Sequence, residues 1–445
     1  MENRCFKDDK MKLLTVKIPI IAFILIFLVS IFSEKSISST IIISQFLFSI
    51  VFILTLQLYN IRSELLFFIL IFLFGGIFTI VNLWLFMEVG NSEFEFNSND
   101  GLNYHNFSQS IINLDIQNGI NYFINSTKYN ITDSGFIIYL SSIYKIYNSI
   151  YFARFINLIF HFLTTILLFD ISKKFIDSVK LRKVLVLFFG LSSPVFFYIS
   201  SGLKETIFSF IITLFIWIYL KKFNLLTLIQ LLTLAFIIST FRLPVSIFLF
   251  VSMIITFNYS LRGRFIKFSF FALTLIFSFF LFQNIEDLFP YFSALSLEDR
   301  TSYGLDSVTF QVLNILAGIF GPFPTIVPSF GNYSDSLWAH GILIKNLLGF
   351  YLFIHLFNFI SFKIINSKLV FITVFIFLNT ISLIFVEQTF KLRYVMPYFD
   401  QILLLSFVGY ESYIKLQQEN KIMTSLNFIY FTLIFIFIIL WNLLR

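Results

Sequence analysis

Long apolar stretches separated by short polar ones recur along almost the whole chain. A run of about 18 or more apolar residues is long enough to cross the hydrocarbon core of a bilayer as an α-helix. Stretches such as "PIIAFILIFLVSIF" are continuously apolar, whereas the strands of a membrane β-barrel alternate apolar and polar positions. The pattern therefore predicts membrane-spanning helices at 14–33, 38–59, 65–87, 149–171, 184–201, 206–220, 225–240, 244–260, 265–283, 342–362, 369–386, 394–411 and 425–444.

Two further apolar runs fit this pattern less well. Residues 135–148 are short for a span, and residues 308–328 are interrupted by glycine and proline. We interpret both as interfacial or re-entrant helices, because irregular backbone is tolerated at membrane depth where it is buried in protein. The predicted fold class is an all-α polytopic membrane protein with about 12–14 transmembrane helices. We expect residues 1–445 to form a single integral membrane domain.

Composition agrees with this fold class. The chain is 58% hydrophobic and 12% charged, whereas soluble domains carry about 25% charged residues. Cys5 is the single cysteine, so neither an intramolecular disulfide nor a cysteine metal site is possible, and the histidines lack metal-binding spacing. The first apolar stretch lacks a small-residue cleavage site, and we interpret it as a retained helix rather than a signal peptide.

The distribution of Lys and Arg predicts the orientation of the helices, because these residues are enriched in short cytoplasmic loops. The basic N-terminal stretch places the N-terminus in the cytoplasm, and the basic loop at 172–183 falls on the same side. Two long loops, 88–135 and 284–341, then lie on the outer side, and both are rich in acidic residues. Loops of this length are usually functional or disordered, and their aromatic content leads us to expect ordered elements there, including short interfacial helices.

Several cations interrupt this charge bias on the outer side. In "SSGLKETIFSF", Lys204 and Glu205 lie side by side at the outer end of a predicted helical hairpin. Such cations could extend to lipid headgroups, and these two residues could pair with each other. We favour an anionic ligand, because the guanidinium group of arginine matches phosphate oxygens. The candidate site for a lipid phosphate or diphosphate comprises Arg154, Lys204, Arg242, Lys391 and Arg393, with Glu205 and Glu387 in support.

Acid–base chemistry is expected in the first outer loop. In "NSNDGLNYHNFSQSI", Asp100 precedes a glycine, which favours a turn, and the residues after it could begin an amphipathic helix. A carboxylate there could accept a proton from a sugar hydroxyl, with His105 assisting and Tyr104 in support. Asp100 could also serve as a helix N-cap, and the two roles are compatible.

The second outer loop contributes the stretch "GIFGPFPTIVPSFGNYSDSLWAHG", residues 318–341. Its glycine and proline content prevents a continuous helix. Its aromatic side chains, such as Phe323, could stack on sugar rings, although aromatic residues at this depth are also common interfacial anchors. His340 is a further supporting candidate.

Four stretches together resemble a known class of enzyme: "NDGLNYH", "SGFIIYLSSIYKIYNSIYFARFINLIFHFLTTILLFDISKKF", "LSSPVFFYISSGLKETIFSF" and "FKLRYVMPYF". They are similar to bacterial polytopic glycosyltransferases of the C-type fold and to the O-antigen or capsule repeat-unit polymerases related to them in layout, over roughly residues 65–410. The resemblance implies a substrate carried on polyprenyl phosphate or diphosphate. It also implies chemistry at the outer face of the bacterial inner membrane, with Asp100 as catalytic base and with Arg154, Arg242 and Arg393 binding the lipid diphosphate.

One departure from the resemblance bears on function. Many C-type transferases carry a pair of acidic residues in the first outer loop, whereas Asn99 precedes Asp100 here. This favours a polymerase of lipid-linked repeat units over a metal-dependent transferase of single sugars, which stays as an alternative, and a divalent metal cofactor stays open. A flippase for the same lipid-linked oligosaccharide is an alternative of another class, and it would need charged residues near the bilayer midplane.

The expected partners follow from the same resemblance. They are a polyprenyl-linked oligosaccharide, whose carrier is part of the substrate, the lipid bilayer and a chain-length regulator. No nucleic-acid partner is expected. The expected location is the bacterial inner membrane, with multiple spans.

Overall fold

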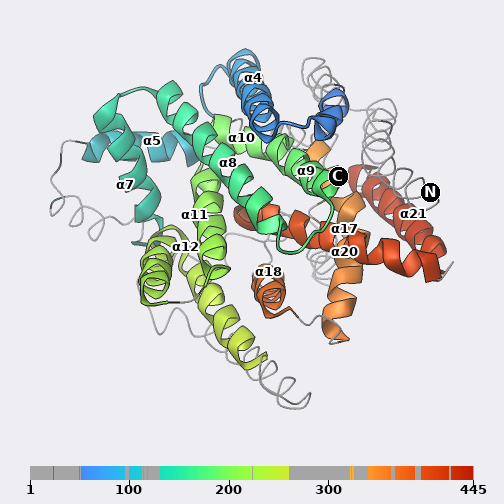
Figure 1. Cartoon of the computed structure of the whole chain (residues 1–445). Coiled ribbons are helices and arrows are strands. Elements are labelled where there is room, and N and C mark those ends of the chain that lie inside the picture. The colour runs from blue at the N-terminus through green and yellow to red at the C-terminus, as the bar shows by residue number, and fades with distance from the viewer. Residues whose placement is uncertain are drawn as a thin grey trace.

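A computed structural model describes residues 52–95, 100–112, 131–222, 224–259, 339–361, 366–385, 392–419 and 422–443, together with positions 24, 50, 114, 118, 321, 323 and 324. The described part of the chain is helical and contains no strand. Seven spans within it are long and apolar enough to cross a membrane. These findings confirm an all-α polytopic membrane protein (Figure 1).

The seven candidate spans match much of the predicted pattern. They are α4 (Glu64–Gly90), α8 (Ile150–Ser172), α9 (Val179–Gly190) together with α10 (Ser193–Ser201), α12 (Leu225–Tyr259), α17 (Ala339–Ile360), α18 (Ser367–Phe385) and α21 (Ile422–Leu443). The other described elements are η2 (Leu56–Asn60), α5 (Asp100–Ile111), α7 (Ile131–Ile146), α11 (Glu205–Tyr219), α19 (Leu392–Val395), η5 (Met396–Tyr398) and α20 (Phe399–Glu419). The predicted spans at 14–33, 38–59 and 265–283, and the second outer loop, lie wholly or largely outside the described residues.

The centre of the bundle is formed by α9 and α10. The most apolar part of this candidate span is completely buried inside the protein. Together, α9 and α10 pack against α4, α8, α17 and α20. The predicted span at 184–201 is therefore two helices, because the chain breaks after Leu191 and α10 begins with Pro194 in its first turn. Proline is favoured at that place, since the first amides of a helix have no intrahelical acceptor.

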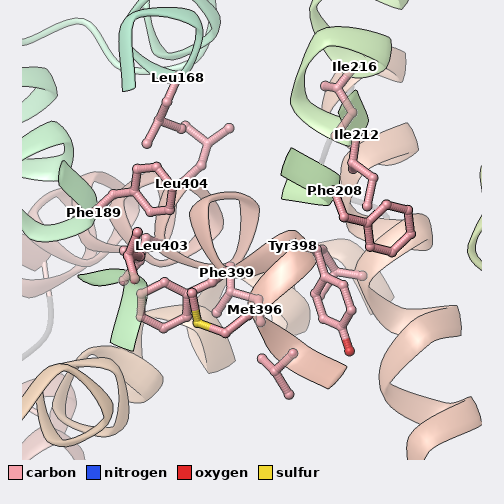
Figure 2. Close-up of a cluster of buried hydrophobic side chains, with 14 of the residues drawn as sticks. Leu168, Phe189, Phe208, Ile212, Ile216, Met396, Tyr398, Phe399, Leu403 and Leu404 are labelled. Carbon is pink, nitrogen blue, oxygen red and sulfur yellow. The ribbon is translucent and has the colours of Figure 1, made fainter. Parts of the chain in front are cut away.

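Apolar side chains from distant parts of the sequence interlock around this centre. Leu168 of α8 and Phe189 of α9 lie near Leu403 and Leu404 of α20, while Phe208 of α11 lies near η5 (Figure 2). The peripheral helices are different, because α4 and α21 keep most of their apolar surface exposed. Such surfaces are suited to contact with lipid tails.

A sharp bend divides α12 at Arg242, whose backbone is extended (φ −167°, ψ 100°). Pro244 lies inside the helix and cannot donate the amide hydrogen bond to the preceding turn. The Ser246 hydroxyl donates to the Ala235 carbonyl at 2.9 Å, although eleven residues of straight helix would be about 16 Å long. The two halves therefore fold toward each other, in agreement with the predicted pair of spans at 225–240 and 244–260.

Two predicted spans differ from the structure. Residues 394–411 do not form one helix from their start, because α19 and η5 precede α20, and Pro397 lies in η5 at the break. The predicted span 206–220 is α11, which has 15 residues and is about 22 Å long, short of a hydrocarbon core of about 30 Å. Glu205 lies at the start of α11 and Arg393 lies in the short α19, so both stay at the helix ends where the predicted spans put them.

The segment predicted to be the first outer loop, residues 88–135, contains α5 and the start of α7. Helix α5 packs against α7, and α7 packs against α12 (Figure 1). The short apolar run at 135–148 thus belongs to a 16-residue helix held by protein contacts.

Candidate functional site

Two of the predicted site residues, Arg242 and Arg393, meet at the carboxylate of Glu205, and two more lie beside them. This carboxylate lies 3.6 Å from the Arg242 guanidinium and 3.8 Å from that of Arg393. Arg393 also forms an ion pair with Asp100. Lys204 precedes Glu205 at the start of α11 and lies over the ring of Tyr104 at 6.0 Å. We call Asp100, Lys204, Glu205, Arg242 and Arg393 the charge cluster.

The turn between α10 and α11 positions Lys204 and Glu205. Gly202 ends α10 with a left-handed backbone (φ 71°), and its amide donates to Ile199 while the amide of Leu203 donates to Tyr198. This is the Schellman arrangement, which satisfies carbonyls that a helix end leaves unpaired. The chain then starts α11 with Glu205 in its first turn, where the helix dipole favours a carboxylate.

Arg154 completes the end of α10. Its Nε donates to the Ser200 carbonyl at 2.6 Å and its Nη2 donates to the Ser201 carbonyl at 3.0 Å. The side chain is buried, and its guanidinium lies 5.3 Å from the Phe94 ring. A cation is favoured at a helix C-terminus, so much of the donor capacity of Arg154 serves the turn that carries Lys204 and Glu205.

The bend of α12 brings Arg242 to the charge cluster. The carbonyl of the preceding residue, Phe241, accepts a hydrogen bond of 3.2 Å from the Lys204 ammonium. The Arg242 guanidinium lies 4.7 Å from the ring of Tyr394, and the Arg393 guanidinium lies 5.5 Å from the same ring. Lys204 and Glu205 therefore do not pair with each other, because each is engaged by a residue from another helix.

Asp100 and Arg393 form the open side of the charge cluster. Their side chains are 39% and 30% exposed, whereas Glu205 is 1% exposed. Burial acts to lower the pKa of Arg393, but the carboxylates of Glu205 and Asp100 outweigh it, and the pKa stays well above its ordinary value. A permanently charged guanidinium thus faces the accessible side.

Gly101 allows the first turn of α5 to lie against the end of α10, next to the charge cluster. The Gly101 amide donates to the Glu95 carboxylate at 2.8 Å. A Cβ at this position would come within 2.5 Å of the Ser201 carbonyl oxygen, so only glycine allows α5 to begin against the end of α10. The predicted helix after Asp100 is present, with Asp100 as its first residue.

His105 belongs to a different group of residues. Its Nδ1 lies 2.9 Å from the Tyr144 hydroxyl, and its ring packs against Phe94. Burial, and then the charge of Arg154, lower the pKa of His105 below its ordinary value, while Glu93 acts in the opposite direction. The ring is therefore neutral at pH 7. None of its described contacts reaches Asp100.

Other predicted residues lie elsewhere. His340 packs at the edge of the Phe52 ring, at the start of α17. Phe323 stacks on Phe437 and is buried, so its ring is used in packing. Lys391 and Glu387 lie outside the described residues.

One buried acid, Asp400, is not among the residues predicted from the sequence. Asp400 is fully buried, and its Oδ2 accepts hydrogen bonds of 2.7 Å from the Thr213 hydroxyl and from the Gln401 amide. Its Oδ1 accepts no hydrogen bond from the part of the chain that the structure describes. Lys345 is a second buried charged residue that was not singled out. The available signal was a lone charge inside a predicted span, which is costly in a membrane and therefore informative.

The electrostatics of the charge cluster suit an anion. Three cations and two carboxylates leave one formal positive charge, and no described residue donates a hydrogen bond to either carboxylate oxygen of Glu205. Arginines held at more than 3.5 Å from this carboxylate have donors left to bind phosphate oxygens. In the described ranges, no three His, Cys, Asp or Glu side chains gather into a metal-binding group. Comparisons with known protein families, with curated proteins and with solved structures found no match.

Proposed function

We propose that this protein polymerises oligosaccharide repeat units carried on polyprenyl diphosphate, at the outer face of a bacterial inner membrane. In this reaction an acceptor sugar hydroxyl attacks the anomeric carbon of a donor chain. The bond from that carbon to the diphosphate oxygen breaks, and polyprenyl diphosphate leaves. The hydroxyl proton passes to a base, for which Asp100 is the candidate.

The observation that carries the proposal is the meeting of Arg242 and Arg393 at Glu205, with Arg393 partly exposed. These residues come from α12, α19 and α11, so the fold brings distant cations to one place. Negative charge develops on the leaving diphosphate, and fixed cations beside it lower the barrier without reorganising. Asp100 and Arg393 are partly exposed and form an ion pair, so a base lies next to a cation. The acceptor hydroxyl needs the base and the leaving diphosphate needs the cation.

Substitution of the two arginines tests the proposal. Arg242→Ala and Arg393→Ala are each expected to slow transfer by about 10²- to 10³-fold, as when a preorganised charge contact is lost. The measurement is the length distribution of polysaccharide made by purified protein from a lipid-linked repeat unit. Arg182→Ala is the matched control. Arg182 lies near the start of α9, where it donates to the Asp177 carbonyl and lies 6.0 Å from the Phe169 ring, and none of its described contacts reaches the charge cluster. Normal chain lengths in both cluster variants, with normal membrane insertion, would refute the proposal.

The same assay separates the single-sugar transferase from the polymerase. A transferase would use a polyprenyl-phosphate monosaccharide and would add one sugar. A polymerase would instead require two lipid-linked repeat units and would release polyprenyl diphosphate.

One observation favours the flippase as a second candidate. Asp400 and Lys345 are buried charged residues inside helices, and intramembrane charges often mark a transport path. The cellular phenotype separates the two functions. A polymerase mutant leaves a single repeat unit on the surface lipid, whereas a flippase mutant leaves none.

A further inference from the structure

A cavity of about 150 Å³ lies between α17, α18 and the segment from α19 to α20. On the same measure one water needs about 10–15 Å³, so the space is roughly ten times larger. Its wall is apolar except at a few positions, and includes Leu352, Ile376 and Ile384. Phe353 also lines it and is 53% exposed. The cavity therefore reaches the outer surface of the bundle, where an apolar helix face meets lipid.

Lys345 is the charged residue among those that line this cavity. Its side chain is 8% exposed, and its ammonium donates to the Gly321 carbonyl. No carboxylate in the described part of the chain lies within ion-pair distance of it. An ammonium that is buried without a counter-charge is costly, because its charge is removed from water without compensation. The described part of the chain therefore supplies no counter-anion for Lys345.

The cavity lies at the same end of the bundle as the charge cluster. Val395 and Tyr398 line it, and they follow Arg393 within the short α19–η5 segment. On α17 the lining residues Lys345, Gly349 and Phe353 recur at helical spacing along one face, so the ammonium marks one end of an apolar strip. An elongated apolar space with a cation at one end has the shape and charge of a site for an anionic lipid.

We propose that this cavity binds the apolar chain of a phosphate-headed lipid and that Lys345 binds the phosphate. The site is separate from the charge cluster, and its occupancy does not depend on the function proposed above. Two sources have this chemistry, namely an anionic phospholipid of the bilayer and a polyprenyl phosphate. Both present a phosphate on a long apolar chain.

Binding measured by native mass spectrometry tests the site. Full-length protein in detergent micelles is titrated with dioleoyl phosphatidic acid and with dioleoyl glycerol, which has the same chains and no phosphate. The wild type is expected to bind the phosphatidic acid about tenfold or more tightly, the equivalent of about 1.4 kcal/mol. Lys345→Met should remove this preference and leave the weaker binding of dioleoyl glycerol unchanged.

Two further variants complete the test. Thr380→Phe keeps Lys345 but places a ring in the cavity that Thr380 lines, and should weaken binding of both lipids. Lys222→Met removes an exposed lysine between α11 and α12 and should change the affinity for neither lipid. Competition with polyprenyl phosphate identifies the source: displacement of bound phosphatidic acid indicates the carrier lipid, and retention indicates a bilayer phospholipid.

Two results would overturn the site. One is a Lys345→Met variant that still prefers phosphatidic acid over dioleoyl glycerol as strongly as the wild type does. The other is a Thr380→Phe variant that binds both lipids as tightly as the wild type does. A thermal midpoint measured for each variant shows that it is folded. Because the readout is lipid binding rather than polysaccharide synthesis, failure here leaves the test of the charge cluster unaffected.

Discussion

At the scale of single residues, the turn at 200–205 concentrates several constraints. The Arg154 guanidinium donates to the carbonyls of Ser200 and Ser201, and Gly202 adopts the left-handed backbone that ends α10. A Cβ on Gly202 would overlap the Arg154 guanidinium. The position of Glu205 therefore depends on a glycine and an arginine that do not contact substrate in the proposed mechanism.

Gly202→Ala is expected to lower stability and activity together. A left-handed backbone at a residue other than glycine costs about 1–3 kcal/mol, and the clash with Arg154 adds to it. Gly76→Ala is the matched control, because its Cβ would have ordinary contact with Leu158, and alanine is the better helix former. The measurement is the thermal unfolding midpoint in detergent. Equal midpoints for Gly202→Ala and the wild type would contradict the structural role of this turn.

At the scale of helices, one polar contact fastens α11 to α20. The Thr213 hydroxyl and the Gln401 amide both donate to Oδ2 of Asp400, and the same amide donates to the Thr213 hydroxyl at 3.0 Å. No cation of the described chain pairs with Asp400. Both donors act on one oxygen, so the contact needs an acceptor there and does not need a negative charge.

Asp400→Asn and Asp400→Leu separate these two requirements. Asparagine can offer a carbonyl oxygen to both donors, so its unfolding midpoint should stay close to that of the wild type. Leucine removes the acceptor that both donors share, although the Thr213 hydroxyl keeps the Ser209 carbonyl and the Gln401 amide keeps the Thr213 hydroxyl. The loss of two hydrogen bonds, at about 1 kcal/mol each, should lower the midpoint clearly. An equally large loss in both variants would mean that the charge of Asp400 is needed.

At the scale of the whole molecule, the charged residues gather at two ends. The charge cluster lies at one end, where α10 stops and α11 begins. At the other end of α11, the ammonium groups of Lys174 and Lys368 both donate to the Leu220 carbonyl, at 2.5 and 2.6 Å. The Lys and Arg bias assigns the charge cluster and Lys174 with Lys368 to opposite sides of the membrane. The fold likewise places them at opposite ends of α11.

Labelling from the two sides of the membrane tests this orientation. In a Cys5→Ser background, Lys145→Cys and Lys222→Cys each introduce one cysteine at an exposed position, at the end of α7 and between α11 and α12. An impermeant maleimide added to intact cells should label position 145, whereas position 222 should react only after the membrane is opened. The reverse pattern would put the charge cluster on the cytoplasmic side and would remove the basis of the proposed function.

Much of the candidate site could be selected from the sequence. Lone cations next to apolar runs pointed to Lys204, Arg242 and Arg393, because charge is costly at that depth and therefore informative. Glu205 and Asp100 were also named, but their pairing with Arg242 and Arg393 could not be predicted, since these ion pairs join residues far apart in the chain. The role of His105 was also beyond reach, because its partner Tyr144 comes from the next described helix.

The sequence alone determined that the chain is a bundle of membrane helices, since continuous apolar length and low charge are properties of composition and local order. Only the tertiary structure decided which charges neutralise one another, where α12 bends and that Lys345 lines an apolar cavity. The physical reason is range. A helix forms from contacts between residues a few positions apart, whereas an ion pair or a cavity depends on how separate helices pack.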